Sequence, residues 1–303
     1  MTESVSSLFD LPVQHVAVNG VDIAYRQAGT GPVLLLLHGH PQTHVMWHKV
    51  WDTLTSQFTC IAADLRGYGD SEKPQGGDDH HGYSKRVMAQ DLADLMTHLG
   101  YERFQALAHD RGARVAHRLA LDHAARVERM MLLDIAPTLD MYAQTTQGFA
   151  QAYFHWFFLT QPAPLPDRML ESDPMFYLRS VMGGRHAGLA PFTETALAEY
   201  ERCARKTGWS YAICEDYRAS AGIDLDHDKQ GREQGERVTC PLRVLWGAKG
   251  VVAKHFDVLS LWKAVADDVD GKAIDCGHYL AEEAPDLLLP EVLAFFDQKP
   301  AAA

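Results

Sequence analysis

The segment Phe104-Gln-Ala-Leu-Ala-His-Asp-Arg-Gly-Ala-Arg114 decides how the chain is expected to fold. Its first five residues form an apolar run that is typical of a buried strand, and the residues after Asp110 can begin a helix. Small residues at Ala108, Gly112 and Ala113 allow the backbone to turn sharply between the two. The pattern therefore predicts a strand, a tight turn at Asp110 and a helix, with a carboxylate displayed at the turn.

Similar apolar runs without alternation lie on both sides of this segment. They cover residues 33–37, 60–63, 130–133 and 242–246. Strands that are buried on both faces have this composition, and such strands belong to parallel sheets. The chain therefore has the pattern of an α/β protein with a mostly parallel central sheet.

Local signals between and before these runs support the same fold. Met88, Leu92, Leu95 and Leu99 recur at helical spacing, and Gly100 is a typical helix stop. Near the N-terminus, Asn19-Gly20 separates two short strand-like runs, 15–18 and 21–25, which predicts a hairpin with a type I′ turn.

The alternation of strands and helices stops after Pro137 and resumes at residue 241. Between these points the chain is helical, aromatic and loop-like, without a clear strand pattern. We interpret residues 1–137 and 238–303 as the core and residues 138–237 as an inserted helical cap domain.

Composition restricts the partners and the location of the protein. The formal net charge of the 303 residues is −12, which disfavours nucleic acid and anionic membranes as partners. Five widely spaced cysteines without a CxxC pair favour reduced thiols. The N-terminus lacks the pattern of a leader peptide, and no apolar run approaches the length of a membrane span. We therefore expect a cytoplasmic protein.

Three residues have the types and the order needed for covalent catalysis. Asp110 is ionised at neutral pH, since the reference pKa of aspartate is about 3.9, and it can attack a saturated carbon to give an ester. His278, in Asp275-Cys-Gly-His278, fits a general base near the C-terminus. The run 242–246 leads into 247–253, which has no carboxylate, so Asp134 is the predicted acid. This order, nucleophile, acid and histidine, is that of the α/β-hydrolases.

Residues close to Asp110 predict how a substrate is held. The backbone N–H groups of His40 and Arg111 would form an oxyanion hole, because His40 follows the strand-like run 33–37. Its side chain is interpreted as lining the pocket or facing solvent. Arg111 and Arg114 place two cations at a helix start, where they oppose the helix dipole, so we expect them to bind a substrate carboxylate.

The aromatic segment 153–159 of the cap leaves two interpretations open. Most of it is expected to pack on the core, whereas His155, Trp156 and Tyr217 could instead direct N–H and O–H donors into the cleft. Two acidic patterns are not interpreted as metal sites. The segment 224–235 lacks the glycine and glutamate of a calcium loop, and residues 78–81 fit a solvated loop better than a metal site. No metal site is predicted.

Taken in order along the chain, several motifs resemble those of the fluoroacetate (haloacetate) dehalogenases of the α/β-hydrolase superfamily. They are His38-Gly-His-Pro-Gln-Thr-His-Val-Met-Trp47, His109-Asp-Arg-Gly-Ala-Arg114, His155-Trp156, Cys214-Glu-Asp-Tyr-Arg218 and Gly277-His278. The resemblance implies an Asp110 nucleophile, an Asp134–His278 acid and base pair, and carboxylate binding by Arg111 and Arg114. It also implies halide binding by His155, Trp156 and Tyr217, a homodimer, and no cofactor.

The sequence thus predicts an enzyme that hydrolyses haloacetates to glycolate and halide through an ester on Asp110. Two departures from the family bear on its substrate range: His40 stands where phenylalanine is common, and residues 181–186 differ from the expected pattern. An epoxide hydrolase with the same nucleophile is the main alternative, since cap tyrosines could protonate an epoxide oxygen. A binding protein without turnover is a further alternative. The preferred halogen and the largest accepted acid stay open.

Overall fold

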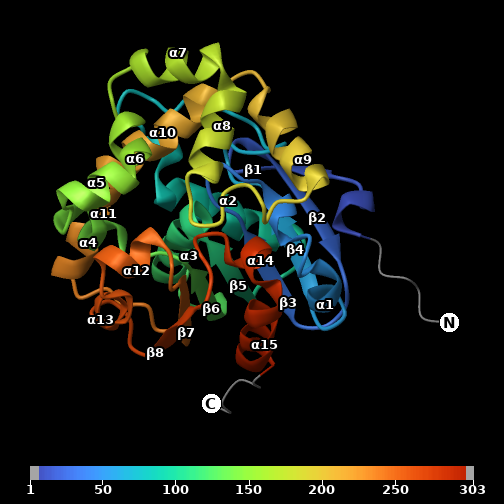
Figure 1. Ribbon diagram of the computed structural model, residues 1–303. Helices are drawn as coiled ribbons and strands as arrows, with labels where there is room; N and C mark the ends of the chain where they lie inside the picture. Colours follow the sequence, from blue (N-terminus) through green and yellow to red (C-terminus); the bar gives the residue numbers. More distant parts are fainter. Residues whose placement is uncertain (1–6, 298–303) are drawn as a thin grey trace.

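In the computed structural model, which describes residues 7–297, an eight-stranded sheet forms the centre of the molecule (Figure 1). The strands follow the order β1-β2-β4-β3-β5-β6-β7-β8. Their bounds are β1 Gln14–Val18, β2 Val21–Ala28, β3 Val33–Leu37, β4 Thr59–Ala63, β5 Phe104–His109, β6 Val127–Leu133, β7 Leu242–Gly247 and β8 Val269–Ile274. The pairs β1–β2 and β2–β4 are antiparallel, and the other neighbouring pairs are parallel. The predicted fold class is therefore confirmed.

The predicted β-hairpin at the N-terminal end is also present. Strands β1 and β2 pair from Val18 and Val21 onward, and Asn19 and Gly20 connect them with φ angles of 46° and 73°. Both values lie in the left-handed region that a type I′ turn requires, which explains the Asn-Gly pair.

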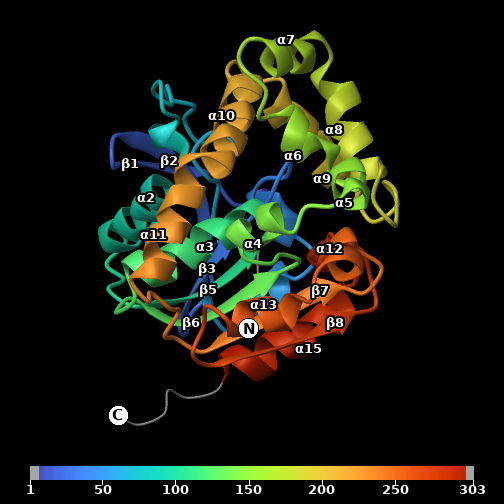
Figure 2. The same ribbon diagram turned by 90° about the vertical axis from the view of Figure 1, so that its left-hand side faces the viewer.

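Helices cover both faces of the sheet. Those outside the segment between β6 and β7 are α1 Trp51–Thr55, α2 Lys85–His98, α3 Asp110–Asp122, α12 Val251–His255, α13 Val258–Lys263, α14 Leu280–Glu283 and α15 Pro285–Phe296. Short 3-10 helices span Leu8–Asp10 (η1), His44–Trp47 (η2) and His81–Tyr83 (η3). Helices α2 and α3 lie together on one face, and α15 lies on the other (Figures 1 and 2). Within residues 7–297, no helix combines the length and apolar character that crossing a membrane requires.

Eight helices follow one another between β6 and β7. They are α4 Thr138–Ala143, α5 Gln147–Ala152, α6 Phe154–Phe158, α7 Leu165–Ser172, α8 Pro174–Gly183, α9 Glu194–Ala204, α10 Trp209–Ala221 and α11 Ile223–Glu233. Helices α6 to α10 stand above one edge of the sheet (Figure 2). We call the segment 138–237 the cap; its boundaries as a domain stay a prediction, and residues 1–6 and 298–303 of the predicted core lie outside the described part.

The order of the strands determines where a site can form. From β3 the chain passes to β4 on one side, and β5 then returns to the other side of β3. In open parallel sheets, ligands bind beyond the carboxyl ends of the strands at such a reversal. His40 lies in the loop after β3, and Asp110 directly follows β5 as the first residue of α3, so both residues lie at this position.

Candidate active site

Asp110 is the first residue of α3, directly after β5, and has a strained backbone. Its φ angle is 45°, in the left-handed region that residues with a side chain rarely adopt. Two close approaches explain the small residues around it. A Cβ atom on Gly39 would lie 2.5 Å from Cβ of Asp110, and one on Gly112 would lie 2.4 Å from the carbonyl oxygen of His38. The turn therefore fixes the Asp110 carboxylate at the carboxyl edge of the sheet.

The surroundings of Asp110 favour its ionised form. The backbone N–H of His40 donates to Oδ2 of Asp110 at 3.0 Å. Burial alone would raise the pKa of Asp110, but His278, His109 and the two arginines Arg114 and Arg111 outweigh burial and hold that pKa below its ordinary value. The carboxylate is therefore ready to act as a nucleophile without a base.

His278 and Asp134 form a hydrogen-bonded pair. Nδ1 of His278 lies 2.5 Å from Oδ2 of Asp134, and the backbone N–H of Gly247 donates to Oδ1 of Asp134 at 2.9 Å. Asp134 follows β6 directly and has a φ angle of 52°. An imidazole whose Nδ1–H donates to a carboxylate keeps an unprotonated Nε2, which can act as a base. The two residues predicted as the acid and the base, Asp134 and His278, are thus buried and in contact.

The side chain of Arg111 is held mainly by the cap. Its Nε and Nη2 atoms donate to the two carboxylate oxygens of Asp216 at 2.8 Å, and Nη2 also donates to Ser220 at 2.6 Å. Its guanidinium carbon lies 4.2 Å from the centre of the Tyr217 ring. Nη1 is buried and lacks a hydrogen-bond partner among the described residues.

This arrangement qualifies the prediction for Arg111. The anion beside Arg111 is the protein's own carboxylate, Asp216, which binds most of the Arg111 donors; the prediction was a substrate carboxylate. Burial acts to raise the pKa of Asp216, and Arg111 and Lys85 together hold it below the ordinary value. Nη1 is the part of Arg111 that stays available to a ligand.

Arg114 differs because its hydrogen bonds go to neutral groups. Nη1 donates to Oγ1 of Thr138 at 2.8 Å and to the carbonyl oxygen of Ala136 at 3.3 Å. The guanidinium carbon lies 4.6 Å from the Trp156 ring centre, and Nε has no hydrogen-bond partner within residues 7–297. Burial and the charge of Arg111 lower the pKa of Arg114. A buried guanidinium without a carboxylate partner is suited to bind an anionic ligand.

The three predicted halide donors are buried side chains on two helices of the cap. His155 and Trp156 come from α6 and Tyr217 from α10, and all three are buried. The rings of His155 and Tyr217 lie 5.8 Å apart. Nε1 of Trp156 and the hydroxyl of Tyr217 have no partner in the described chain. Since buried polar groups are normally hydrogen-bonded, these two donors indicate a ligand or solvent site.

The side chain of His40 is buried and does not face solvent. It is 2 % exposed, and its Nε2 lies 3.1 Å from the hydroxyl of Tyr177. The ring stacks on His155 with 6.0 Å between the ring centres. Burial is the main cause that lowers the pKa of His40 to about 3. The imidazole is therefore neutral at pH 7 and adds a polar wall to the cap side of the site.

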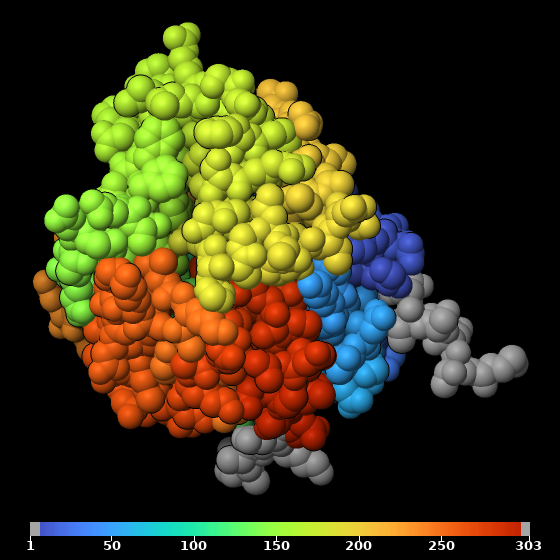
Figure 3. Space-filling model, in the orientation of Figure 1, coloured from blue at the N-terminus to red at the C-terminus, as the bar shows by residue number. Residues whose placement is uncertain are grey.

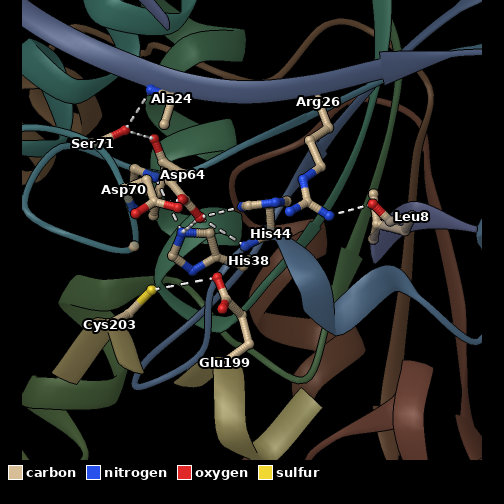
Figure 4. A network of polar contacts seen from close by, with 12 residues as sticks. Leu8, Ala24, Arg26, His38, His44, Asp64, Asp70, Ser71, Glu199 and Cys203 are labelled. Atoms are coloured by element: carbon tan, nitrogen blue, oxygen red, sulfur yellow. Dashed lines mark hydrogen bonds and ion pairs between the residues drawn. The ribbon is translucent and has the colours of Figure 1, made fainter. Parts of the chain in front are cut away.

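A polar network below the site holds the loop that carries His40 (Figure 4). Asp64, which follows β4, accepts hydrogen bonds at 2.8 Å from the backbone N–H groups of His44 and Asp70, and His38 accepts one at 3.1 Å from Leu65. These bonds join the ends of β3 and β4. Nearby, Asp70, Glu199 and Cys203 come together, but Arg202 forms ion pairs with both acids. This cluster is therefore already neutralised by the protein.

Sequence reasoning gave no role to two residues of this site, Asp216 and Arg185. Asp216 stands beside Tyr217 in a quoted motif, but only the fold shows that it meets Arg111. Arg185 lies in the segment 181–186 that departs from the family, and its guanidinium carbon lies 4.3 Å from the Tyr153 ring centre. The sequence signal that could have pointed to Arg185 is a basic residue in a segment that departs from the family pattern.

Comparison with known proteins agrees with the fold. A sequence model of the alpha/beta hydrolase fold matches residues 32–285. The chain therefore belongs to the α/β-hydrolase family, and the fold and homologues support a hydrolase.

Among individual proteins, the chain is similar to both a dehalogenase and an epoxide hydrolase. It is 40% identical over 274 residues to the fluoroacetate dehalogenase of a Burkholderia species, covering 89% of each chain. It is 35% identical to the soluble epoxide hydrolase of Corynebacterium sp. strain C12, covering 92% of this chain and 95% of the relative. The crystal structure of ALR0039 from Nostoc sp. PCC 7120 aligns with a TM-score of 0.93 at 48% identity, covering 96% and 99% of the two chains.

Proposed function

We propose that this hydrolase removes halide from short 2-haloacids, with haloacetates as the simplest substrates. The observation that carries the proposal is the buried Arg114 guanidinium, which is near the ionised Asp110 and makes its hydrogen bonds to neutral groups. A neutral substrate would leave that guanidinium without a hydrogen-bonded anion in a buried site, whereas a carboxylate would provide one.

In the first step, Arg114 and Nη1 of Arg111 bind the substrate carboxylate and orient the halogen-bearing carbon toward Asp110. An oxygen of Asp110 attacks this carbon, the carbon–halogen bond breaks, and the electron pair leaves with the halide. Trp156, Tyr217 and His155 provide donors for the departing anion. Each hydrogen bond to a charged acceptor contributes about 1.5–3 kcal/mol, which matters most for fluoride, a poor leaving group.

In the second step, water hydrolyses the ester on Asp110. Nε2 of His278 takes a proton from water, and the resulting hydroxide attacks the Asp110 carbonyl. The bond between that carbonyl carbon and the glycolyl oxygen then breaks, this oxygen receives the proton from His278, and glycolate leaves with the Asp110 carboxylate restored. The N–H of His40 and the N–H of Arg111 at the start of α3 stabilise the oxygen that becomes negative. The placement of the His40 N–H is supported by its 3.0 Å contact with Oδ2 of Asp110. None of these steps calls for a metal or an organic cofactor.

Epoxide hydrolysis is the second candidate. The buried hydroxyls of Tyr153 and Tyr217 lack partners among the described residues, and two such hydroxyls could donate to an epoxide oxygen. The similarity to the Corynebacterium epoxide hydrolase supports this candidate. The charge of Arg114 speaks against it, because an epoxide is neutral.

A direct assay separates the two candidates. Fluoride and chloride release from fluoroacetate and chloroacetate is measured beside diol formation from styrene oxide, with wild type and Asp110→Asn. We expect halide release by the wild type and its loss in Asp110→Asn. The control Asp78→Asn changes an exposed acid and should behave as wild type. Diol formation without halide release would refute the dehalogenase proposal.

We also propose that the protein is a cytoplasmic homodimer. Support for the dimer comes from the cap surface, where Leu165, Met169 and Phe176 on α7 and α8 are 55%, 55% and 71% exposed. Large apolar side chains gathered on a surface are typical of an interaction site. Light scattering on the purified protein tests this: one chain mass at micromolar concentration would contradict it.

A further inference from the structure

A third arginine reaches the candidate site from the cap. Arg185 lies in the turn that follows α8, and its guanidinium carbon is 4.3 Å from the centre of the Tyr153 ring. Its Nε atom is buried and has no hydrogen-bond partner within residues 7–297. A buried guanidinium nitrogen without a partner points to a ligand or to solvent in the site.

The turn that carries Arg185 rests on the residue before the proposed base. A Cβ atom on Gly277 would lie only 2.9 Å from Cβ of His186, so the cap packs closely on Gly277 at His186. The outer side of the turn borders a surface cavity of about 370 Å³, lined in part by His186, Lys49 and Lys249. In Figure 3 this part of the cap (yellow) meets the C-terminal part of the core (orange and red). The turn thus lies between solvent and the candidate active site.

The groups around Arg185 stabilise its charge. Burial acts against the charged form, whereas Tyr153, Tyr279 and Asp110 outweigh burial and hold the pKa of Arg185 above its ordinary value. Asp110 is the single carboxylate among these groups. The same field holds the pKa of His155 well below its ordinary value: burial is the main cause and Arg185 the next.

The charges of the site leave room for one anion. Arg111 is neutralised by Asp216, and Asp134 is bound to His278. Asp110 then interacts electrostatically with two guanidinium groups, Arg114 and Arg185. Neither arginine forms a salt bridge with a carboxylate in the described part of the chain. Without Arg185, a monoanionic substrate would bring a second negative charge to a site with one remaining cation.

We infer that Arg185 is a specificity residue that binds the charge of carboxylate substrates from the cap side and so favours anionic over neutral halogenated compounds. This inference rests on the proposed dehalogenase function. Arg185 belongs to the segment 181–186, which departs from the expected family pattern, so this segment would take part in substrate selection. A side chain from the cap acts together with Arg114 from the core.

Chloride release from chloroacetate and from chloroacetamide, its neutral analogue, tests the inference. In Arg185→Met, kcat/KM for chloroacetate should fall at least about tenfold relative to chloroacetamide, since a charged hydrogen bond is lost. Arg185→Lys should retain most of the preference. Arg179→Met is the matched control, because Arg179 lies on α8 but pairs with Glu201 at the surface. An unchanged ratio, or an equal loss for both substrates, would overturn the inference.

A binding measurement keeps the two proposals distinguishable. Acetate binding to Asp110→Asn is compared by calorimetry with binding to Asp110→Asn/Arg185→Met. We expect the dissociation constant to rise at least about tenfold in the double variant. Equal affinity, or no binding by either protein, overturns the role of Arg185. Weaker acetate binding in the double variant, together with a wild type that releases no halide, would instead refute the proposed reaction.

Discussion

At the scale of single residues, Asp110 and His278 divide the proposed chemistry between them. Asp110 attacks carbon as a carboxylate, and its pKa is held low by its histidine and arginine neighbours. His278, whose Nδ1 is hydrogen-bonded to Asp134, acts as a base only when the ester is hydrolysed. Removing one of the two groups should therefore stop the reaction at a different stage from removing the other.

His278→Gln should stop the reaction at the ester. Halide release should occur once per active site, and steady turnover should fall about 10²–10⁴-fold, as expected for loss of a general base. Intact-protein mass spectrometry after addition of chloroacetate should show one added carboxymethyl group, which peptide analysis should place on Asp110. Asp110→Asn is the control and should gain no mass. An unmodified His278→Gln protein would contradict the covalent route.

Trp156→Phe should affect fluoride more than bromide. The change removes the unpartnered Nε1–H but keeps an aromatic ring beside Arg114. Loss of one donor to a departing fluoride corresponds to about 1.5–3 kcal/mol, or a roughly 10- to 150-fold lower kcat for fluoroacetate. Bromoacetate provides the internal control, because bromide needs less help to leave. Equal losses for both substrates would indicate a packing role for Trp156.

At the scale of secondary-structure elements, α10 is joined to the core by the buried ion pair between Asp216 and Arg111. Lys85 of α2 also forms an ion pair with Asp216. One cap helix therefore contacts the two core helices α2 and α3 through a single carboxylate. Because Tyr217 is the next residue, the same contact fixes a proposed halide donor.

Asp216→Asn should destabilise the whole protein. The change leaves Arg111 and Lys85 buried beside a neutral amide, and breaking a buried ion pair costs about 3–5 kcal/mol. The urea midpoint of unfolding should fall correspondingly. Asp226→Asn is the control, because its side chain is 77% exposed in a pair with Lys229 and should change the free energy of unfolding by less than about 1 kcal/mol. An unchanged midpoint in Asp216→Asn would show that this contact is not a main link between cap and core.

The elements near Asp110 could be predicted because they depend on local rules. An apolar run followed by small residues determines the turn, and a strand end without a carboxylate points to Asp134 as the acid. The partner of Arg111 could not be predicted in this way. Asp216 lies 105 residues further along the chain, and no local pattern states that α10 crosses over α3. Likewise, the direction of the Arg185 side chain depends on how the turn after α8 packs on Gly277.

At the scale of the whole molecule, several buried neutral histidines make stability depend on pH. Burial is the main cause that lowers the pKa values of His40, His109 and His117 to about 3 each, from the ordinary value of 6.5. Between these values the unfolded chain binds protons that the folded chain excludes. The stabilising contribution of these groups is thus complete above pH 6.5 and is lost progressively as the pH falls toward 3.

Acid should therefore unfold the protein steeply. Each group contributes up to about 1.4 kcal/mol per pH unit, so these three groups together should lower the free energy of unfolding by up to about 4 kcal/mol per unit between pH 6 and pH 4. His117→Gln removes one such group outside the candidate active site and should reduce the slope by up to about 1.4 kcal/mol per pH unit. The exposed His98, replaced by glutamine, provides the control. Equal slopes in all three proteins, measured by urea unfolding, would contradict the role of His117.

The buried link between Asp216 and Arg111 also limits how small molecules can reach and leave the pocket. Opening of the whole cap would separate Asp216 from Arg111 and leave both charges without a partner, which costs about 3–5 kcal/mol. This cost would slow the opening more than about a hundredfold. We therefore expect substrate and product to exchange with solvent through local motion of peripheral segments, such as the turn at residues 184–188. Because Tyr217 is the residue after Asp216, we expect its position to stay the same in each catalytic cycle.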